Sequence, residues 1–380
     1  MIKGTILLIA MLPVMAGAII AASLPLIAQH FAAYPQGGLY ARLMLTLPAL
    51  FVACTGPLVG YLIDRFHSRP VLLWGLLVFS VAGSSGLWLT DPVAMLAGRA
   101  LLGVSIACII TSNTTLIGDL FSGPQRNAIM GQRGAFMSLG GFLFVSLGGL
   151  LADWHWRAPF AVYFIALPFF VLTWAVLPDL KKDRTTEPQK VDVPLSPTGQ
   201  TGLILGASFF GMLMFYLIPV ELPFFLRHRF YASGATIGLS IGLTTLFGAL
   251  ASLTHKKIIQ RVSFARIQSL SFVLIGIGYL GLQFSTSSWM IWLALVPAGL
   301  GSGLMMPNFT LWLMSVTPAA FRGKYMGRLT FFIFIGQFCA PFLVMYTPPT
   351  WGHYSFAATL LFTGSALLFW QSYRAVDARD

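Results

Sequence analysis

Twelve long apolar runs, separated by short polar turns and one longer polar stretch, constrain the fold of this chain more than any other feature. A helix of about 20 apolar residues is long enough to cross the hydrocarbon core of a bilayer. The first six runs are Thr5–Gln29, Leu43–Leu62, Pro70–Leu89, Pro92–Ile117, Met130–Ala152 and Ala158–Leu177. The other six are Thr201–Leu226, Ala235–Leu253, Ile267–Phe284, Trp289–Leu313, Tyr325–Tyr346 and Phe356–Trp370. The sequence therefore predicts twelve transmembrane helices.

The composition excludes a soluble protein of this length. Hydrophobic residues make up 57% of the 380 residues and charged residues only 9%, and no soluble core could bury that much apolar surface. The strands of a transmembrane barrel alternate apolar and polar residues, whereas these runs are continuously apolar. We therefore expect an all-α integral membrane protein. Its first run is longer than the apolar part of a signal peptide, so we interpret it as a retained helix.

The chain divides into two halves of six runs each. The stretch Pro178–Gln200 contains four prolines and several lysines, the composition of a flexible linker. We expect a six-helix bundle over residues 1–178, a cytoplasmic linker over 179–200 and a second six-helix bundle over 201–380. Three matches between the halves, at offsets of 198, 195 and 196 residues, indicate a duplication. They are Ser23-Leu24-Pro25 with Glu221-Leu222-Pro223, Asn113 with Asn308, and Met130-Gly131 with Met326-Gly327.

The basic residues predict the orientation in the membrane. With the amino terminus in the cytoplasm, 18 of the 23 Lys and Arg residues lie at the cytoplasmic face, which is the bias expected of inner-membrane proteins. We therefore expect a protein of the bacterial inner membrane with both termini in the cytoplasm. The net charge of +12 follows this membrane pattern, so we expect no nucleic-acid partner. The histidines show no metal spacing, and we expect neither a metal nor a cofactor.

A charged segment, Gly60–Pro70, joins the second and third runs and places Asp64 directly beside Arg65. It matches six positions of the signature G-x-L-a-D-r-x-G-r-k-x-x-l of the major facilitator superfamily. The matching residues are Gly60, Leu62, Asp64, Arg65, Arg69 and Leu72, while His67 and Ser68 stand where the signature has glycine and a basic residue. On these residues and the six-plus-six organisation, the chain resembles this superfamily and, within it, the twelve-helix drug:proton antiporter branch.

The resemblance implies that this segment is a cytoplasmic gate. In the family the acid lies near the start of the eleventh helix, here near Tyr325, where a helix amino terminus favours a carboxylate. The basic residues lie near an acid at the end of the fourth helix, which is Asp119 here. The expected gate residues are Gly60, Asp64, Arg65, Arg69 and Asp119. The alternative is that these charges only satisfy the positive-inside rule.

A second signature, R-x-x-q-G-x-g on the fourth run, is met by Arg99 and Gly103 but not by Leu102 and Ser105. In the family this arginine is linked to proton transfer. An arginine within a transmembrane helix is a functional candidate by default, because burying its charge in lipid is costly. The alternative for Arg99 is that its side chain extends to the outer interface.

The antiporter signature of the fifth helix, g-x-x-x-G-P-x-x-G-G, is only partly present. Gly140, Gly148 and Gly149 match it, but Phe144 and Val145 replace Gly-Pro. The eleventh run carries a similar pattern, Gly336 followed by Ala340 and Pro341, which suggests that the pliable helix has moved to the other half. We expect helix packing or flexing at Gly103, Gly140, Gly148, Gly149, Gly336 and Pro341.

Glu221 is the one acid that the pattern places inside an apolar run, away from predicted loops and helix ends. It follows Tyr216 and lies between Pro219 and Pro223, whose missing amide hydrogens loosen a helix. A buried carboxylate can exchange a proton near neutral pH, as a coupling site requires. Glu221 is therefore our candidate for the proton site or for a contact to a cationic substrate. The alternative is a solvated ion at the outer surface.

Three amides complete the candidate substrate and coupling residues. Asn113 and Asn308 are related by the repeat, and Gln337 lies on the eleventh run. A buried amide needs a partner, so each makes either an interhelical hydrogen bond or a substrate contact. The candidates for proton coupling or substrate binding are thus Glu221, Arg99, Tyr216, Asn113, Asn308 and Gln337.

These expectations describe a transporter. We expect alternating access, with proton-coupled efflux of a small organic molecule or drug by a monomer in the lipid bilayer. The alternative within the class is proton-coupled uptake or facilitated transport of a metabolite, organic anion or siderophore. An intramembrane enzyme or receptor is not expected, because no nucleophile, metal cluster or phosphate-binding loop stands out in the sequence.

Overall fold

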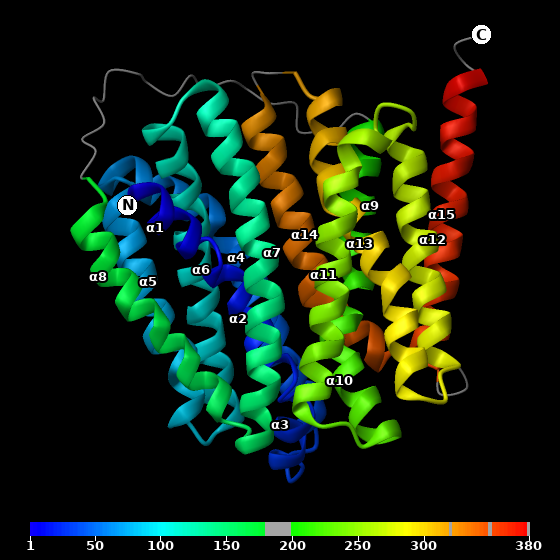
Figure 1. The fold of residues 1–380 in the computed structure, drawn as a ribbon, viewed down its shortest axis with the longest axis horizontal. Helices are drawn as coiled ribbons and strands as arrows, with labels where there is room; N and C mark the ends of the chain where they lie inside the picture. The colour runs from blue at the N-terminus through cyan, green and yellow to red at the C-terminus, as the bar shows by residue number, and fades with distance from the viewer. Residues whose placement is uncertain (179–198, 319–320, 349–351, 378–380) are drawn as a thin grey trace. The chain divides into compact units, whose positions relative to one another are not determined.

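The computed structural model describes residues 1–178, 199–318, 321–348 and 352–377. Almost all of these residues are helical and none of them forms a strand (Figure 1). The all-α prediction is therefore confirmed. Most of the predicted linker, residues 179–198, lies outside the described residues.

The described chain forms two compact units. The N-terminal unit comprises Met1–Asp192 together with Ala232–Leu239, and the C-terminal unit comprises Val193–Tyr231 and Ser240–Asp380. In the N-terminal unit, α4 and α5 both pack against α6, and α2 packs against α7. Its helices are α1 (Ile2–Ile9), α2 (Leu12–Ala21), α3 (Leu24–His30), α4 (Gly37–Phe66), α5 (Ser68–Ser84), η1 (Ser85–Leu87), α6 (Pro92–Leu120), α7 (Gly123–Trp154), η2 (Ala158–Ile165) and α8 (Ala166–Val176).

In the C-terminal unit, α12 packs against both α13 and α15, and α14 packs against α9. Its helices are α9 (Gly199–Phe215), α10 (Leu217–Phe230), α11 (Gly234–Ile258), α12 (Phe264–Gln283), α13 (Ser288–Val316), α14 (Arg322–Met345) and α15 (His353–Asp377). The first six residues of α11, Gly234–Leu239, group with the N-terminal unit.

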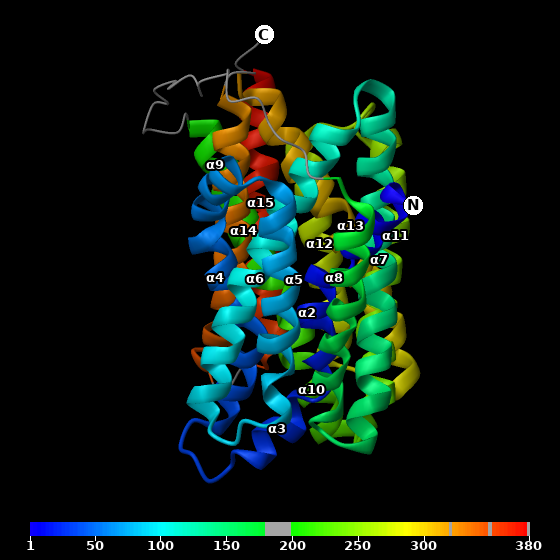
Figure 2. The ribbon, with the colours of Figure 1, turned by 90° about the vertical axis from the view of Figure 1, so that its left-hand side faces the viewer.

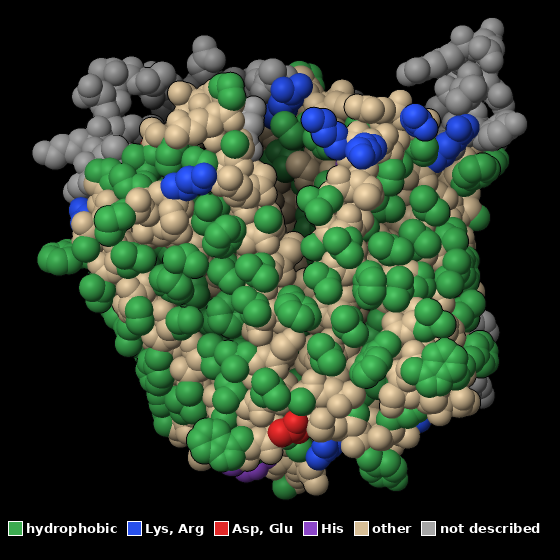
Figure 3. Space-filling model, in the orientation of Figure 1, with side chains coloured by type: hydrophobic (Ala, Val, Ile, Leu, Met, Phe, Trp, Pro, Cys, Tyr) green, Lys and Arg blue, Asp and Glu red, His purple; other side chains and the backbone are tan. Residues whose placement is uncertain are grey.

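Eleven helical stretches among the described residues are long and apolar enough to cross a membrane, and they correspond to the first eleven predicted runs. The twelfth run lies within α15. On the face drawn in Figure 3, hydrophobic side chains cover the middle, and most Lys and Arg side chains lie near the upper edge. Such a distribution is expected of helices that cross a bilayer with their charged ends in water.

Prolines explain why two predicted helices are broken into shorter ones. In an α-helix each N–H donates to the carbonyl four residues earlier, and proline has no N–H to donate. Three helices end four residues before a proline, and α1, α2 and α3 therefore follow one another as short pieces (Figure 2). The helix ends and their prolines are Ile9 and Pro13, Ala21 and Pro25, and Phe215 and Pro219.

Several of the predicted glycines lie where two helices approach closely. A Cβ at Gly148 of α7 would overlap the carbonyl oxygen of Ile19 in α2, and one at Gly140 would come within 2.9 Å of the Met11 Cβ. Close backbone packing of this kind stabilises helix pairs in lipid. A Cβ at Gly103 would likewise overlap the carbonyl oxygen of Pro48 in α4, and one at Gly336 would overlap the carbonyl oxygen of Phe209 in α9. These glycines therefore pack helices, whereas a Cβ at Gly60 would meet nothing within 4 Å.

The charged segment Gly60–Pro70 is more regular than the tight turn that the sequence indicated. Helix α4 continues to Phe66 and α5 begins at Ser68, so His67 alone separates them. The backbone of His67 has φ 70° and ψ 161°, a region that is almost exclusive to glycine because a Cβ clashes there. The signature has glycine at this position, and the conformation shows why.

Replacing His67 with glycine should stabilise the protein. The strain at this backbone conformation costs 1–3 kcal/mol, and part of the gain is offset by the greater freedom of glycine in the unfolded chain, so we expect His67→Gly to raise the free energy of unfolding by about 1 kcal/mol. Thermal unfolding of the purified protein in detergent measures the effect. His67→Ala is the control, since alanine keeps the strain. Equal melting temperatures for the two variants would contradict the account.

Candidate functional site

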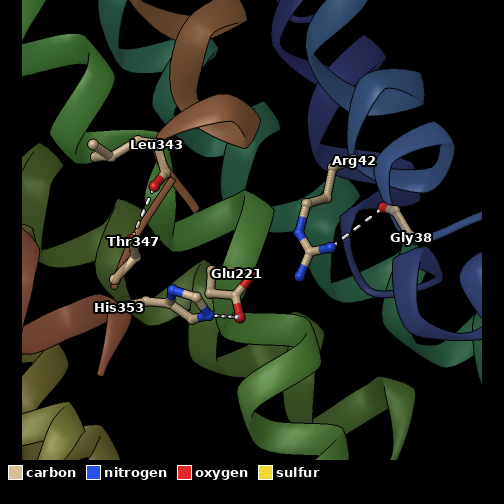
Figure 4. A network of polar contacts seen from close by, with 6 residues as sticks. All are labelled: Gly38, Arg42, Glu221, Leu343, Thr347 and His353. Atoms are coloured by element: carbon tan, nitrogen blue, oxygen red, sulfur yellow. Dashed lines mark hydrogen bonds and ion pairs between the residues drawn. The ribbon is translucent and has the colours of Figure 1, made fainter. Parts of the chain in front are cut away.

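Glu221 lies inside the C-terminal unit, on α10, and only 7% of it is exposed. Its Oε1 lies 3.8 Å from Nε2 of His353, the first residue of α15 (Figure 4). No other acidic side chain is described in this unit. The alternative of a solvated ion therefore does not fit, because the carboxylate is buried beside an imidazole.

The backbone around Glu221 is unusually poor in helical hydrogen bonds. Pro219 and Pro223 cannot donate to the carbonyls of Phe215 and Pro219, and the chain breaks at Tyr216, which caps α10. One turn earlier, the hydroxyl of Tyr279 on α12 donates to the carbonyl of Met214. His353 begins α15, so the carboxylate also lies near the positive end of a helix dipole. The arrangement places the carboxylate of Glu221 beside a histidine, at a point where the helix lacks two of its backbone donors.

Arg99 is buried, with 1% exposure, and its donors are directed at neutral groups. Its Nε donates to the carbonyl of Met44 at 2.7 Å, and its two Nη atoms donate to the Tyr163 hydroxyl and the Ala16 carbonyl, each at 2.8 Å. The Tyr163 hydroxyl in turn donates to the Ala16 carbonyl at 2.6 Å. The Met44 carbonyl is available because Pro48, four residues later in α4, has no N–H.

These contacts give Arg99 a positioning role. It joins α6 to α2, to α4 and to η2, and all of its partners within the described residues are uncharged. The side chain does not extend to the outer interface, because it is buried and its guanidinium is bound by Met44, Tyr163 and Ala16. A buried guanidinium held by carbonyls keeps its charge, so Arg99 contributes a fixed positive charge to the interior of the N-terminal unit.

The three predicted amides differ in their partners. Asn113 donates to the carbonyl of Ile6 in α1 at 3.0 Å, which is the interhelical bond that the sequence offered as one alternative. Asn308 donates to the carbonyl of Phe264 and to the Oε1 of Gln268. Gln337 is 9% exposed and makes no hydrogen bond with the described residues. Pro341 also leaves the Gln337 carbonyl without its helical donor, so Gln337 retains two groups for a ligand.

The predicted gate residues lie at the ends of helices. Asp64 and Arg65 are exposed in the last turn of α4, and Asp119 is exposed near the end of α6. Arg69 donates to the carbonyl of Trp174 in α8 at 2.6 Å, in place of the expected pair with Asp119. Pro178 explains this partner, because it cannot supply an N–H to Trp174. Within the described residues neither Asp64 nor Asp119 forms an ion pair.

Sequence reasoning missed Asp153, whose carboxylate caps a helix. Asp153 lies in the last turn of α7 and accepts hydrogen bonds from the backbone N–H of Gly234 at 2.5 Å and of Ala235 at 2.9 Å, in the first turn of α11. Both segments belong to the N-terminal unit. A Cβ at Gly149 would overlap the Gly234 carbonyl, so this predicted glycine lets the two helices meet. No local pattern in the sequence indicates this contact, because Asp153 and Gly234 are 81 residues apart.

Sequence reasoning also missed Tyr163 and His353, which contact Arg99 and Glu221. Both lie in or beside apolar runs, where a tyrosine or histidine gives no periodic signal. The described residues contain no group of three or more metal-ligating side chains.

Comparison with known proteins agrees with this architecture. A model of the Major Facilitator Superfamily matches residues 6–206 and 203–380. The bacillibactin exporter of Bacillus subtilis (strain 168) is 26% identical over 283 residues, which are 70% of this chain and 70% of that protein. The class D tetracycline resistance protein of Salmonella ordonez is 24% identical over 299 residues, 76% of this chain and 74% of that protein.

A solved structure shares the fold. The crystal structure of a D-xylose-proton symporter covers 97% of this chain and 96% of its own chain, with a TM-score of 0.79 and 16% sequence identity. At that identity the similarity shows the fold alone.

Proposed function

The chain belongs to the Major Facilitator Superfamily, whose members are transporters and not enzymes, and we propose that it exports a small organic molecule in exchange for protons. The observation that carries the proposal is Glu221, a buried carboxylate in the second unit. A proton-coupled transporter needs a protonatable group within its membrane part, and carboxylates buried there serve that role. The relatives named as an exporter and as a drug-resistance protein support the outward direction.

The proposal includes roles for the other candidates. Glu221 takes up and releases the proton, and the imidazole of its neighbour His353 lies 3.8 Å from the carboxylate. Gln337, with its unused amide and carbonyl, contacts the substrate. Arg99 and Asn113 position helices through carbonyl contacts. The protein works as a monomer in the bacterial inner membrane with both termini in the cytoplasm, which the distribution of basic residues supports.

The second candidate function is uptake or facilitated transport of an anionic metabolite or siderophore. Arg99 favours it, because the described residues place no carboxylate beside this buried charge. An anionic solute would be attracted by that charge, whereas a cationic solute would be attracted by Glu221.

The experiment begins with a thermal-shift screen of the purified protein against cationic drugs, amino acids, sugars and siderophores. A compound that stabilises the protein is then tested for flux in proteoliposomes under imposed pH gradients. An exporter accumulates the solute on the acidic side, since the solute moves against the proton. Accumulation on the alkaline side would establish symport, and flux that ignores the pH gradient would remove proton coupling from the account.

Asp64→Asn should slow transport without abolishing substrate binding. Asp64 lies in the last turn of α4, where the helix dipole disfavours an acid. Its carboxylate therefore does not stabilise α4, and removing the charge should leave the helix intact. A gate residue of this kind affects the rate of conformational exchange. Flux in proteoliposomes and the thermal shift with substrate measure the two properties separately. Loss of substrate binding would show that the segment supports the fold and does not act as a gate.

A further inference from the structure

A cluster of three buried polar side chains lies in the C-terminal unit, apart from Glu221. His255 of α11 is 2% exposed, and Gln268 of α12 and Asn308 of α13 are fully buried. The His255 Nε2 lies 3.4 Å from the Asn308 Oδ1. The Asn308 Nδ2 lies 3.0 Å from the Phe264 carbonyl and 3.2 Å from the Gln268 Oε1. Three helices are thus joined by a chain of side-chain hydrogen bonds.

The geometry fixes where the hydrogens lie. The Phe264 carbonyl can only accept, so the Asn308 amide must present its NH₂ group to it and its oxygen to His255. An amide oxygen can only accept, so the His255 Nε2 must carry a hydrogen and donate it. The other ring nitrogen, Nδ1, makes no hydrogen bond with the described residues. The bond to Asn308 therefore uses Nε2 and leaves Nδ1 out of the hydrogen-bonded cluster.

The cluster occupies one layer near the ends of its helices. Ala251 and Leu304, each one turn earlier than His255 and Asn308, form an apolar core with Ile267. On the other side the Phe264 and Trp312 rings stack with an interplanar angle of 4° and a centroid distance of 6.3 Å. Apolar side chains therefore flank the hydrogen-bonded side chains along the helices. Buried polar side chains are costly unless they are hydrogen-bonded, and these three bond to one another.

The charged groups around His255 are all basic. Lys256 and Lys257 follow it on α11, Arg261 lies in the connection to α12, and Arg266 lies on α12; all four are exposed. Helix α13 has no charged residue. No described carboxylate is available as a counter-ion at this end of the unit, since Glu221 is on α10. No described acidic side chain is therefore placed to take a proton from Nδ1.

We propose that His255 is a second protonation site, which binds a proton at Nδ1 from water and returns it to water during the transport cycle. This role rests on the proposed proton coupling. It extends that coupling by adding a second site, since Glu221 and His255 lie on different helices of the same unit. Histidine suits the task, since the imidazole is the side chain that changes charge in the physiological pH range. In this account Asn308 and Gln268 hold the ring in place through its Nε2–H.

The first measurement tests proton binding without any substrate. The full chain, labelled with ¹⁵N in its six histidines, is titrated by NMR in nanodiscs between pH 5 and pH 8, and the His255 signals are assigned by their loss in His255→Gln or His255→Asn. We expect the Nε2–H form at high pH and movement of both nitrogen signals as the pH falls. His255 signals that stay constant over this range would overturn the proposal.

The second measurement tests whether the cycle uses the proton. Solute exchange at equal concentrations, without a pH gradient, is followed at several pH values for the wild-type protein, His255→Gln and His228→Gln. Glutamine keeps an N–H for Asn308 but cannot titrate, and His228 is an exposed histidine of the same unit. We expect the exchange rate to change by about tenfold over about two pH units in the wild-type and His228→Gln proteins, as the protonated fraction of an imidazole does, and to change less steeply in His255→Gln, where Glu221 is the remaining protonation site.

A His255→Gln variant with the wild-type pH profile would overturn the role of His255 in the cycle even if the ring titrates. His255→Ala also removes the hydrogen bond to Asn308 and so separates a structural role of the ring from its protonation. A lower melting temperature in His255→Ala than in His255→Gln measures the structural contribution of that bond. Failure of the proposed export function can be told apart from failure of the His255 role. The first appears as solute flux that ignores the pH gradient, and the second appears in exchange at equal concentrations, which requires no pH gradient.

Discussion

Replacing Glu221 with glutamine should abolish proton-driven transport while leaving exchange of solute at equal concentrations. Glutamine has the same shape as glutamate but cannot bind or release a proton. The carboxylate is buried next to His353, and no other acidic side chain is described in the C-terminal unit. Gradient-driven flux in proteoliposomes should therefore fall to the level that the solute gradient alone produces.

Asp91→Asn is the matched control for this variant. It is also a change from carboxylate to amide, but Asp91 is exposed and its side chain accepts a hydrogen bond from the Ala94 N–H, which an asparagine oxygen can also accept. This control should keep wild-type coupling. Undiminished proton-driven flux in Glu221→Gln would move the coupled proton to another residue.

Replacing Arg99 with leucine should cause the largest loss of stability among the candidate residues. The change removes three hydrogen bonds and leaves the Met44 carbonyl without any donor, because Pro48 cannot supply one. Hydrogen bonds from a charged donor contribute about 1.5–3 kcal/mol each, and an unsatisfied buried carbonyl costs about 1–3 kcal/mol, so we expect a loss of at least about 3 kcal/mol. Thermal unfolding in detergent measures it.

Two variants complete this series. Tyr163→Phe removes one acceptor of Arg99 and one donor to Ala16, so its effect should be smaller than that of Arg99→Leu. Arg126→Leu removes an exposed arginine of the same unit and should change stability little. If Arg99→Leu were as stable as Arg126→Leu, the carbonyl contacts would not hold the helices together, and a direct role in proton transfer would return as the explanation of this arginine.

The fold was largely readable from the sequence because lipid imposes simple rules. Apolar runs of membrane-spanning length predicted the helices, and the described runs are helical within a few residues, with longer extensions at Gly37 and Gly123. The breaks before Pro13, Pro25 and Pro219 were not predicted, because proline also lies inside unbroken helices, such as Pro48 and Pro57 in α4. The helices themselves follow from local composition, which is why they can be inferred without a structure.

The site was less predictable because its partners are distant in sequence. The sequence indicated that Glu221 and Arg99 are unusual, but it gave no sign that His353 faces the first or that Met44 and Ala16 bind the second. Asp119 was expected beside Arg69 from the resemblance, whereas the nearer acceptor is the Trp174 carbonyl freed by Pro178. A backbone carbonyl that lacks its helical donor can bind an arginine, but patterns of side-chain types in the sequence do not indicate such a partner.

His255 shows the same limit. Next to Lys256 and Lys257, at the edge of an apolar run, it resembles an exposed helix end. Its burial depends on Asn308 and Gln268, which come from two other helices. Only the three-dimensional structure brings these residues into one layer.

The central claim is that Glu221 carries a proton that substrate binding displaces, and proton release tests it most directly. Purified protein in weakly buffered detergent solution is mixed with a substrate found by the thermal-shift screen, and a pH indicator follows the solution. The account predicts acidification on binding by the wild-type protein and none with Glu221→Gln, although both bind. Substrate binding to the wild-type protein without proton release, or equal release by Glu221→Gln, would contradict it.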